Sequence, residues 1–214
     1  MNAPPPPVVS LDGLLQAADN ALRALFAPAE ASRAPGQLPE SPPMGEADRR
    51  LVAGLMRVNH AGEIAAQALY HGQALMARSA QTRQFLLRAA AEEGDHLAWC
   101  EQRLRELGDR TSLLNPLWYA GAFAIGAGAA ALSDRLSLGF VRETERQVEG
   151  HLAEHLARLP PEDARTRTIL ETMQREELGH AQAAQTAGAA ELPALLRALM
   201  GLTSQLMTRS AYYV

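Results

Sequence analysis

Lysine is missing from this chain of 214 residues, in which all 20 basic residues are arginines. The absence excludes a Walker A phosphate loop, a Schiff-base lysine and a Ser-x-x-Lys nucleophile, because each of these sites needs a lysine. The net charge of −4 argues against a protein that binds nucleic acid by neutralising its phosphates. We therefore expect no nucleic-acid partner.

Cysteine is almost as scarce, since Cys100 is the only one. Neither an internal disulfide nor a thiolate metal cluster can form from a single cysteine. Oxygen and nitrogen ligands remain, supplied by 24 acidic residues and six histidines. The first ten residues, MNAPPPPVVS, lack the basic and apolar regions of a signal peptide, so none is expected.

Strand alternation and hairpin signals are also missing, whereas good helix formers are dense. We predict four long helices from four proline-free stretches, at residues 46–77, 82–107, 134–159 and 162–187. Shorter helices are expected after Ser10, which can cap one, and over residues 192–207. The predicted fold class is all-α: a four-helix bundle made of two antiparallel helix pairs.

Proline divides the chain into two parts. Five prolines fall within residues 28–45, which hold few large apolar side chains, so this stretch is expected to be a linker or mobile loop. We divide the chain into residues 1–45, a short helix plus a partly flexible proline-rich linker, and a helical domain over residues 46–214.

Two Glu-x-x-His motifs carry the chemistry. They are Glu93-x-x-His96 and Glu177-x-x-His180, and each lies in the second helix of a predicted pair. Residues three apart lie on the same face of a helix, so each motif can direct one carboxylate and one imidazole to a common point.

A site inside a bundle also needs a carboxylate from the first helix of each pair, at the same height. Residues at one height lie equally far from the turn that joins the helices. Glu63 and Glu93 are centred on residue 78, where a turn is expected, and Glu145 and Glu177 are centred on Pro161. Two turns thus predict the same two carboxylate pairs.

Apolar residues surround these glutamates at helical spacing, and burying an ionised carboxylate costs several kcal/mol unless it is compensated. Two divalent metal ions would neutralise four glutamates. Carboxylate and imidazole ligands without thiolates suit iron or manganese better than zinc or copper. The alternatives are salt bridges to arginine and ordinary solvated helix faces.

The remaining polar candidates carry weaker signals. His151 and His155 have a spacing that can hold zinc, but no third ligand is evident, which favours a solvated or outer role. Tyr70 follows Glu63 by two helical turns and can hydrogen-bond near the site or belong to the core. His60 and His71 are expected to be structural or to lie on the surface.

Residues 111–133 carry no charge over 23 positions, which is long enough to cross a bilayer. A crossing would place the two helix pairs on opposite sides of the membrane, where they could not build one site. We therefore expect an apolar helix at the membrane interface or at the mouth of the bundle. Trp118 and Tyr119 at its start suit an interfacial position.

These motifs together resemble the demethoxyubiquinone hydroxylases, which are ferritin-like di-iron monooxygenases of ubiquinone biosynthesis. The resemblance covers residues 46–214 and rests on both Glu-x-x-His motifs, on Glu145, on the stretches LNPLWYAGAFAIGA and GFVRETERQVEGHL, and on Arg57-Val58-Asn59-His60-Ala61-Gly62-Glu63. The two quoted stretches are similar to the bacterial members.

The resemblance implies two iron ions held by Glu63, Glu93, His96, Glu145, Glu177 and His180. It places His151 where the family has a histidine for proton or electron transfer. It implies hydroxylation of a 2-polyprenyl-3-methyl-6-methoxy-1,4-benzoquinol ring with O2, with NADH or a quinol as the reductant.

The resemblance also implies a peripheral location on the cytoplasmic face of the bacterial inner membrane. Other members of a ubiquinone-biosynthesis complex and a second copy of the chain are further candidate partners. Two alternatives stay open: a ferritin-like ferroxidase or peroxide scavenger, and a metal-free helical membrane scaffold. Metal content and product analysis distinguish them.

Overall fold

The structure is a computed structural model that describes residues 9–40 and 43–214. Residues 1–8, which make up most of the stretch where no signal peptide is expected, lie outside the described residues. The described elements are all helices: α1 (Leu11–Phe26), α2 (Glu46–Met76), α3 (Ala80–Glu106), α4 (Asn115–Leu132), α5 (Asp134–Arg158), α6 (Ala164–Thr186) and α7 (Ala194–Tyr213). The predicted all-α class is confirmed.

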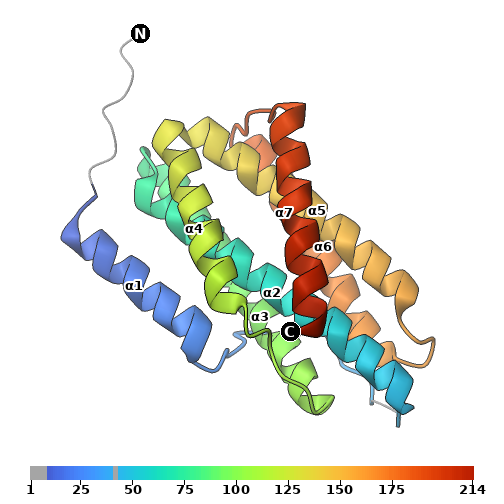
Figure 1. Ribbon diagram of the computed structural model, residues 1–214. Helices are drawn as coiled ribbons and strands as arrows, with labels where there is room; N and C mark the ends of the chain where they lie inside the picture. Colours follow the sequence, from blue (N-terminus) through green and yellow to red (C-terminus); the bar gives the residue numbers. More distant parts are fainter. Residues whose placement is uncertain (1–8, 41–42) are drawn as a thin grey trace.

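Helices α2, α3, α5 and α6 form the predicted bundle, in which α2 pairs with α3 and α5 pairs with α6 (Figure 1). In each hairpin, a side chain caps the start of the second helix. Ser79 caps α3 by accepting a hydrogen bond from the Thr82 amide, and Asp163 caps α6 by accepting one from the Thr166 amide. The two connections are centred on residues 78 and 161, as the carboxylate spacing requires.

The bundle core includes two apolar clusters that are separated along the helices. One cluster lies where α2 and α6 begin and includes Val52, Leu55, Met56, Trp99, Leu152, Leu170 and Met173. The other lies where α2 and α6 end and includes Leu69, Tyr70, Leu86, Val141 and Ala184. On every bundle helix, the predicted carboxylate falls between the two clusters.

Helix α4 connects the two hairpins and packs closely along α2 (Figure 1). Two glycines permit this approach: a Cβ on Gly72 would lie 2.2 Å from the Phe123 carbonyl oxygen, and one on Gly126 would lie 2.2 Å from the Leu69 carbonyl oxygen. Backbone atoms cannot move aside as a flexible side chain can. The pair therefore fixes where α4 crosses the bundle.

Buried polar pairs fix α2 against its other neighbours. Asn59 and His155 join α2 to α5 through a 2.8 Å hydrogen bond, and His60 and Asn115 join α2 to the start of α4 at 3.3 Å. Arg57 donates to the Asp109 carboxylate at 2.7 Å and to the Tyr212 carbonyl of α7. The three residues Arg57, Asn59 and His60, which precede Glu63, therefore fix the position of α2 relative to the neighbouring helices.

Helix α7 is longer than the predicted helix over residues 192–207, so this part of the prediction is wrong. It extends to Tyr213 because residues 202–213 contain no proline or glycine that would end the helix. The Ser210 hydroxyl donates to the Leu206 carbonyl at 2.8 Å, and Arg57 holds the carbonyl of Tyr212.

The described residues between α1 and α2 contain no helix, but they pack on the bundle. They cross α3 and α6, to which they are joined by several hydrogen bonds. The sequence does not predict these contacts. Among the described helices, none combines the length and the apolarity that a membrane span requires.

Candidate metal centre

Four glutamates from four helices meet in the layer between the two apolar clusters: Glu63 of α2, Glu93 of α3, Glu145 of α5 and Glu177 of α6. None of them is more than 2% exposed to solvent. The two turns set the heights of these side chains, as the spacing predicted. The bundle thus concentrates four acidic groups where water is excluded.

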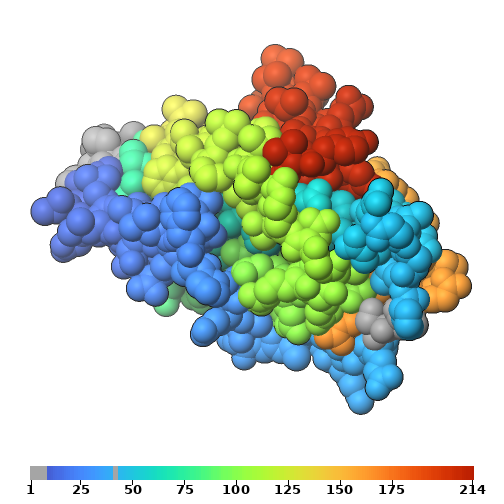
Figure 2. Space-filling view, turned by 60° about the horizontal axis from the view of Figure 1, so that its bottom comes forward, coloured from blue at the N-terminus to red at the C-terminus, as the bar shows by residue number. Residues whose placement is uncertain are grey.

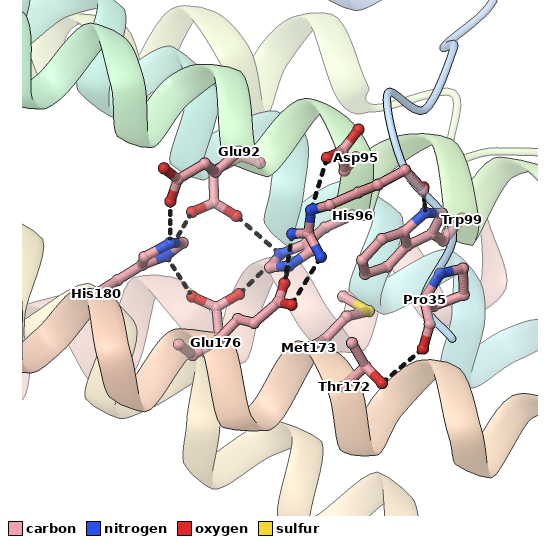
Figure 3. Close-up of polar contacts among 12 residues, drawn as sticks. Pro35, Glu92, Asp95, His96, Trp99, Thr172, Met173, Glu176 and His180 are labelled. Atoms are coloured by element: carbon pink, nitrogen blue, oxygen red, sulfur yellow. Dashed lines mark hydrogen bonds and ion pairs between the residues drawn. The ribbon is translucent and has the colours of Figure 1, made fainter. Parts of the chain in front are cut away.

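Both motif histidines point their Nδ1 atoms at this layer (Figure 3). His96 Nδ1 lies 3.1 Å from Glu93 Oε2 and 3.1 Å from Glu177 Oε1. His180 Nδ1 lies 3.1 Å from Glu93 Oε1 and 3.4 Å from Glu177 Oε2. Each imidazole therefore contacts both central carboxylates.

The six side chains divide into two overlapping groups that could each hold a metal ion, with ligand atoms within 4.8 Å of one another. The His96 group is Glu63, Glu93, His96 and Glu177; the His180 group is Glu93, Glu145, Glu177 and His180. Glu93 and Glu177 belong to both, so each has one oxygen available for either position. This arrangement suits two adjacent metals bridged by carboxylates.

Each histidine also has an outer carboxylate partner, which the sequence reading missed. His96 Nε2 of α3 bonds to Glu176 of α6 at 2.8 Å, and His180 Nε2 of α6 bonds to Glu92 of α3 at 2.7 Å. The signal is visible in the sequence, since each motif reads Glu-Glu-x-x-His. Metal-binding histidines commonly donate their other ring N–H to such a carboxylate, which fixes the ring.

Burial and mutual repulsion shape the acidity of the glutamates. Burial raises the pKa of Glu63 and of Glu145 well above the ordinary value, and the charges of Glu93 and Glu177 raise both further. Burial would also raise the pKa of Glu93, but hydrogen bonds from His180 and His96 outweigh it and lower that pKa.

The imidazoles respond in the opposite direction. Burial alone would lower the pKa of His180, yet its bonds to Glu177 and Glu93 raise the pKa to about 12. The pKa of His96 is raised well above its ordinary value because bonds to Glu176, Glu177 and Glu93 outweigh its burial. Protons thus supply the positive charge in the metal-free chain, and a bound metal would replace them.

Several buried polar atoms of this layer form no hydrogen bond of regular geometry among the described residues, although most of them lie in close contact with a group of opposite charge. They are Glu93 Oε1, Glu145 Oε2, both carboxylate oxygens of Glu177, and His180 Nδ1. A buried polar atom without a well-aligned hydrogen bond is costly, so such a concentration requires an explanation. Two metal ions would satisfy all five atoms at once, and the residues present therefore fit such a centre.

The weaker candidates separate into two kinds. The buried Tyr70 hydroxyl donates a hydrogen bond to Glu145 Oε1, which places this residue directly behind the His180 group. His151 is not brought into the layer, because its Nε2 bonds to Ser204 of α7 at 3.1 Å. His155 bonds to Asn59, so this pair does not form a zinc site with the described residues.

The comparisons with known proteins agree with this geometry. Residues 50–211 match the family described as ubiquinone biosynthesis protein COQ7. The chain is 53% identical to a protein of Chromobacterium violaceum over 95% of this chain and 100% of that one. It is 55% identical to one of Cupriavidus taiwanensis, again over 95% and 100% of the two chains.

A relative from Ralstonia pickettii is 60% identical over 80% of this chain and 79% of its own. All three relatives are named 3-demethoxyubiquinol 3-hydroxylase. Fold and site define a ferritin-like carboxylate–histidine bundle. Within that class, the chain belongs to the COQ7 ubiquinone-biosynthesis family.

Replacing Glu177 tests the shared carboxylates. Glu177→Gln keeps the shape of the side chain but removes a charge that serves both groups, so we expect iron affinity to fall by about tenfold or more. Iron per chain, measured after loading with Fe²⁺ without oxygen and desalting, checks this. Glu143→Gln, at a buried glutamate of α5 outside both groups, is the control and should retain its iron. Equal iron content in the two variants would contradict the assignment.

Proposed function

We propose that this chain is a di-iron monooxygenase that hydroxylates the ring of 3-demethoxyubiquinol with O2 in ubiquinone biosynthesis. One observation carries the proposal: six ligand-type side chains, of which all but His180 are buried, converge in a member of this family. The relatives' printed names supply the substrate class and the reaction type.

Iron is the metal that suits both the candidate ligands and this reaction. The ligands are carboxylates and imidazoles, and the single thiol, Cys100, is buried with its sulfur 3.9 Å from that of Met173. Hydroxylation of an aromatic ring by O2 needs a redox-active metal or organic cofactor, and the bound irons would supply the electron transfer to O2. NADH or the quinol itself is the proposed source of the electrons.

The chain's own residues would prepare the centre in three ways. Glu92 and Glu176 hold the outer nitrogens of His180 and His96, which orients both Nδ1 atoms inward. The Tyr70 hydroxyl donates a hydrogen bond to the Glu145 carboxylate and so orients it. The two apolar clusters exclude water from the layer, which protects reactive oxygen chemistry from side reactions.

A membrane surface is the proposed source of the polyprenyl substrate, which is poorly soluble in water. Helices α1, α4 and α7 all reach the molecular surface (Figure 2). Each exposes large apolar side chains, among them Leu11, Leu15 and Phe26 of α1, Leu117 and Ile125 of α4, and Leu195, Leu202 and Leu206 of α7. We propose that the protein is peripheral and binds the cytoplasmic face of the bacterial inner membrane through these helices.

The hydroxylation is tested by product analysis. Iron-loaded protein, a short-chain demethoxyubiquinol, NADH and ¹⁸O2 should yield a ring hydroxylated with one labelled oxygen atom, detected by mass spectrometry. Glu177→Gln should yield little product, and Glu143→Gln should behave as the unchanged chain. Oxidation of iron without any hydroxylated ring would favour the ferroxidase alternative and contradict the proposal.

Membrane binding is tested by flotation with phosphatidylcholine vesicles. The unchanged chain should float with the vesicles. The double variant Leu202→Glu, Leu206→Glu should stay at the bottom, because it places charge on side chains that are 62% and 63% exposed. The same exposure predicts an unchanged thermal midpoint. Flotation that does not differ between the two proteins would contradict a role for α7.

A further inference from the structure

A segment that precedes the bundle lies directly beside the metal layer. Residues 29–35, here named the strap, cross from α3 to α6. Ser32 donates to the Asp95 carboxylate of α3 through its amide at 2.6 Å and its hydroxyl at 3.0 Å. At the other end, the Pro35 carbonyl accepts a hydrogen bond from the Thr172 hydroxyl of α6 at 2.8 Å. The strap therefore ties together the two helices that carry the Glu-x-x-His motifs.

Arg33 is the charged centre of the strap. Its two terminal nitrogens pair with the two oxygens of Glu176 at 2.7 Å each, and its Nε lies 3.0 Å from Asp95. Its guanidinium carbon lies 4.9 Å from the centre of the Trp99 ring, whose Nε1 donates to the Arg33 carbonyl at 2.9 Å. A planar guanidinium that pairs with both carboxylate oxygens fixes the orientation of that carboxylate.

This contact reaches the metal layer through one further hydrogen bond. Glu176, which Arg33 holds, accepts a hydrogen bond of 2.8 Å from His96 Nε2. The centre of the Trp99 ring lies 5.2 Å from that of the His96 ring. Figure 3 shows Asp95, Trp99 and Glu176 gathered around His96. The side chain of His96 is fully buried beneath them. Arg33, Glu176 and His96 thus form a continuous chain from the strap to Nδ1.

Among the described residues, no arginine pairs with the outer glutamate of the His180 position. The side chain of His180 is 14% exposed, and its outer partner Glu92 is 52% exposed. Among residues 9–40 and 43–214, Glu92 forms an ion pair with His180 alone. Glu176 forms ion pairs with both His96 and Arg33. The two metal positions therefore share their central carboxylates but differ in what holds their histidines.

We propose that Arg33 is a positioning residue for His96, and that the strap closes the His96 metal position while leaving the His180 position to exchange metal with solvent. This inference rests on the proposed di-metal function. Release of a metal requires its histidine to turn away. At His180 that motion displaces only an exposed glutamate, whereas at His96 it must break the paired contacts of Arg33 as well.

The family match does not define this device, because it begins at residue 50 and the strap ends at residue 35. The strap belongs to the segment that the sequence indicates only as a proline-rich linker. Its role follows from where the chain places Ser32 and Arg33 on the bundle.

The test measures how fast two bound Fe²⁺ ions pass to an excess of a coloured ferrous chelator under anaerobic conditions. The unchanged, fully loaded chain should release iron in two phases of equal amplitude. Arg33→Ala should accelerate the slow phase by about tenfold, the lower end of the range for losing a direct partner of a metal ligand, because Arg33 acts on His96 through Glu176. The fast phase should not change.

Two further variants sharpen the result. Glu92→Gln should accelerate the fast phase alone, because it weakens the hold on His180. Arg23→Ala removes an arginine that is paired with Asp19 on the surface of α1, so both phases should match those of the unchanged chain. Arg33→Lys keeps the charge but loses the paired contact, and its slow phase should lie between the two extremes.

Three outcomes overturn the inference in distinguishable ways. Failure to bind iron would refute the proposed function, and the strap inference with it. Two bound irons that leave the unchanged chain in a single phase would refute the strap inference alone. Equal acceleration of both phases in Arg33→Ala, with a lower thermal midpoint, would show that the strap only stabilises the fold.

Discussion

The repulsion among four buried glutamates is the constraint on which the rest of the structure depends. Glu63, Glu93, Glu145 and Glu177 lie at one level inside a helical bundle, where a lone negative charge is strongly disfavoured. Two imidazoles, held inward by outer carboxylates, offset part of this charge. The buried oxygens and the nitrogen that form no regular hydrogen bond mark where two divalent metals would bind and supply the missing positive charge.

The arrangement has an approximate internal symmetry that the N-terminal segment breaks. The two Glu-Glu-x-x-His motifs exchange their outer glutamates, so that each helix holds the histidine of the other. Arg33 adds a cation to only one of these contacts. Two chemically similar groups of candidate ligands therefore experience different surroundings, which is the basis of the proposed difference between a slowly and a rapidly exchanging metal position.

Much of the fold and of the candidate site could be predicted from sequence because both depend on local spacing. Proline-free stretches and their turns fix the register of each hairpin, and the register brings Glu63 level with Glu93. Contacts between distant segments leave no such trace. The packing of Arg33 on Glu176 and the reach of α7 to Tyr213 depend on partners far apart in the chain. The role of His151 in proton or electron transfer stays a prediction, and its hydrogen bond to Ser204 of α7 is another contact between distant segments that the sequence does not indicate.

The central claim is that the glutamate layer holds two metals bridged by Glu93 and Glu177. Anomalous X-ray diffraction at the iron absorption edge, from crystals of the iron-loaded protein, tests it most directly. The account predicts two adjacent peaks, one in the His96 group and one in the His180 group. Peaks at other residues, such as His151 and His155, or a well-ordered glutamate layer with no peak at all, would contradict it.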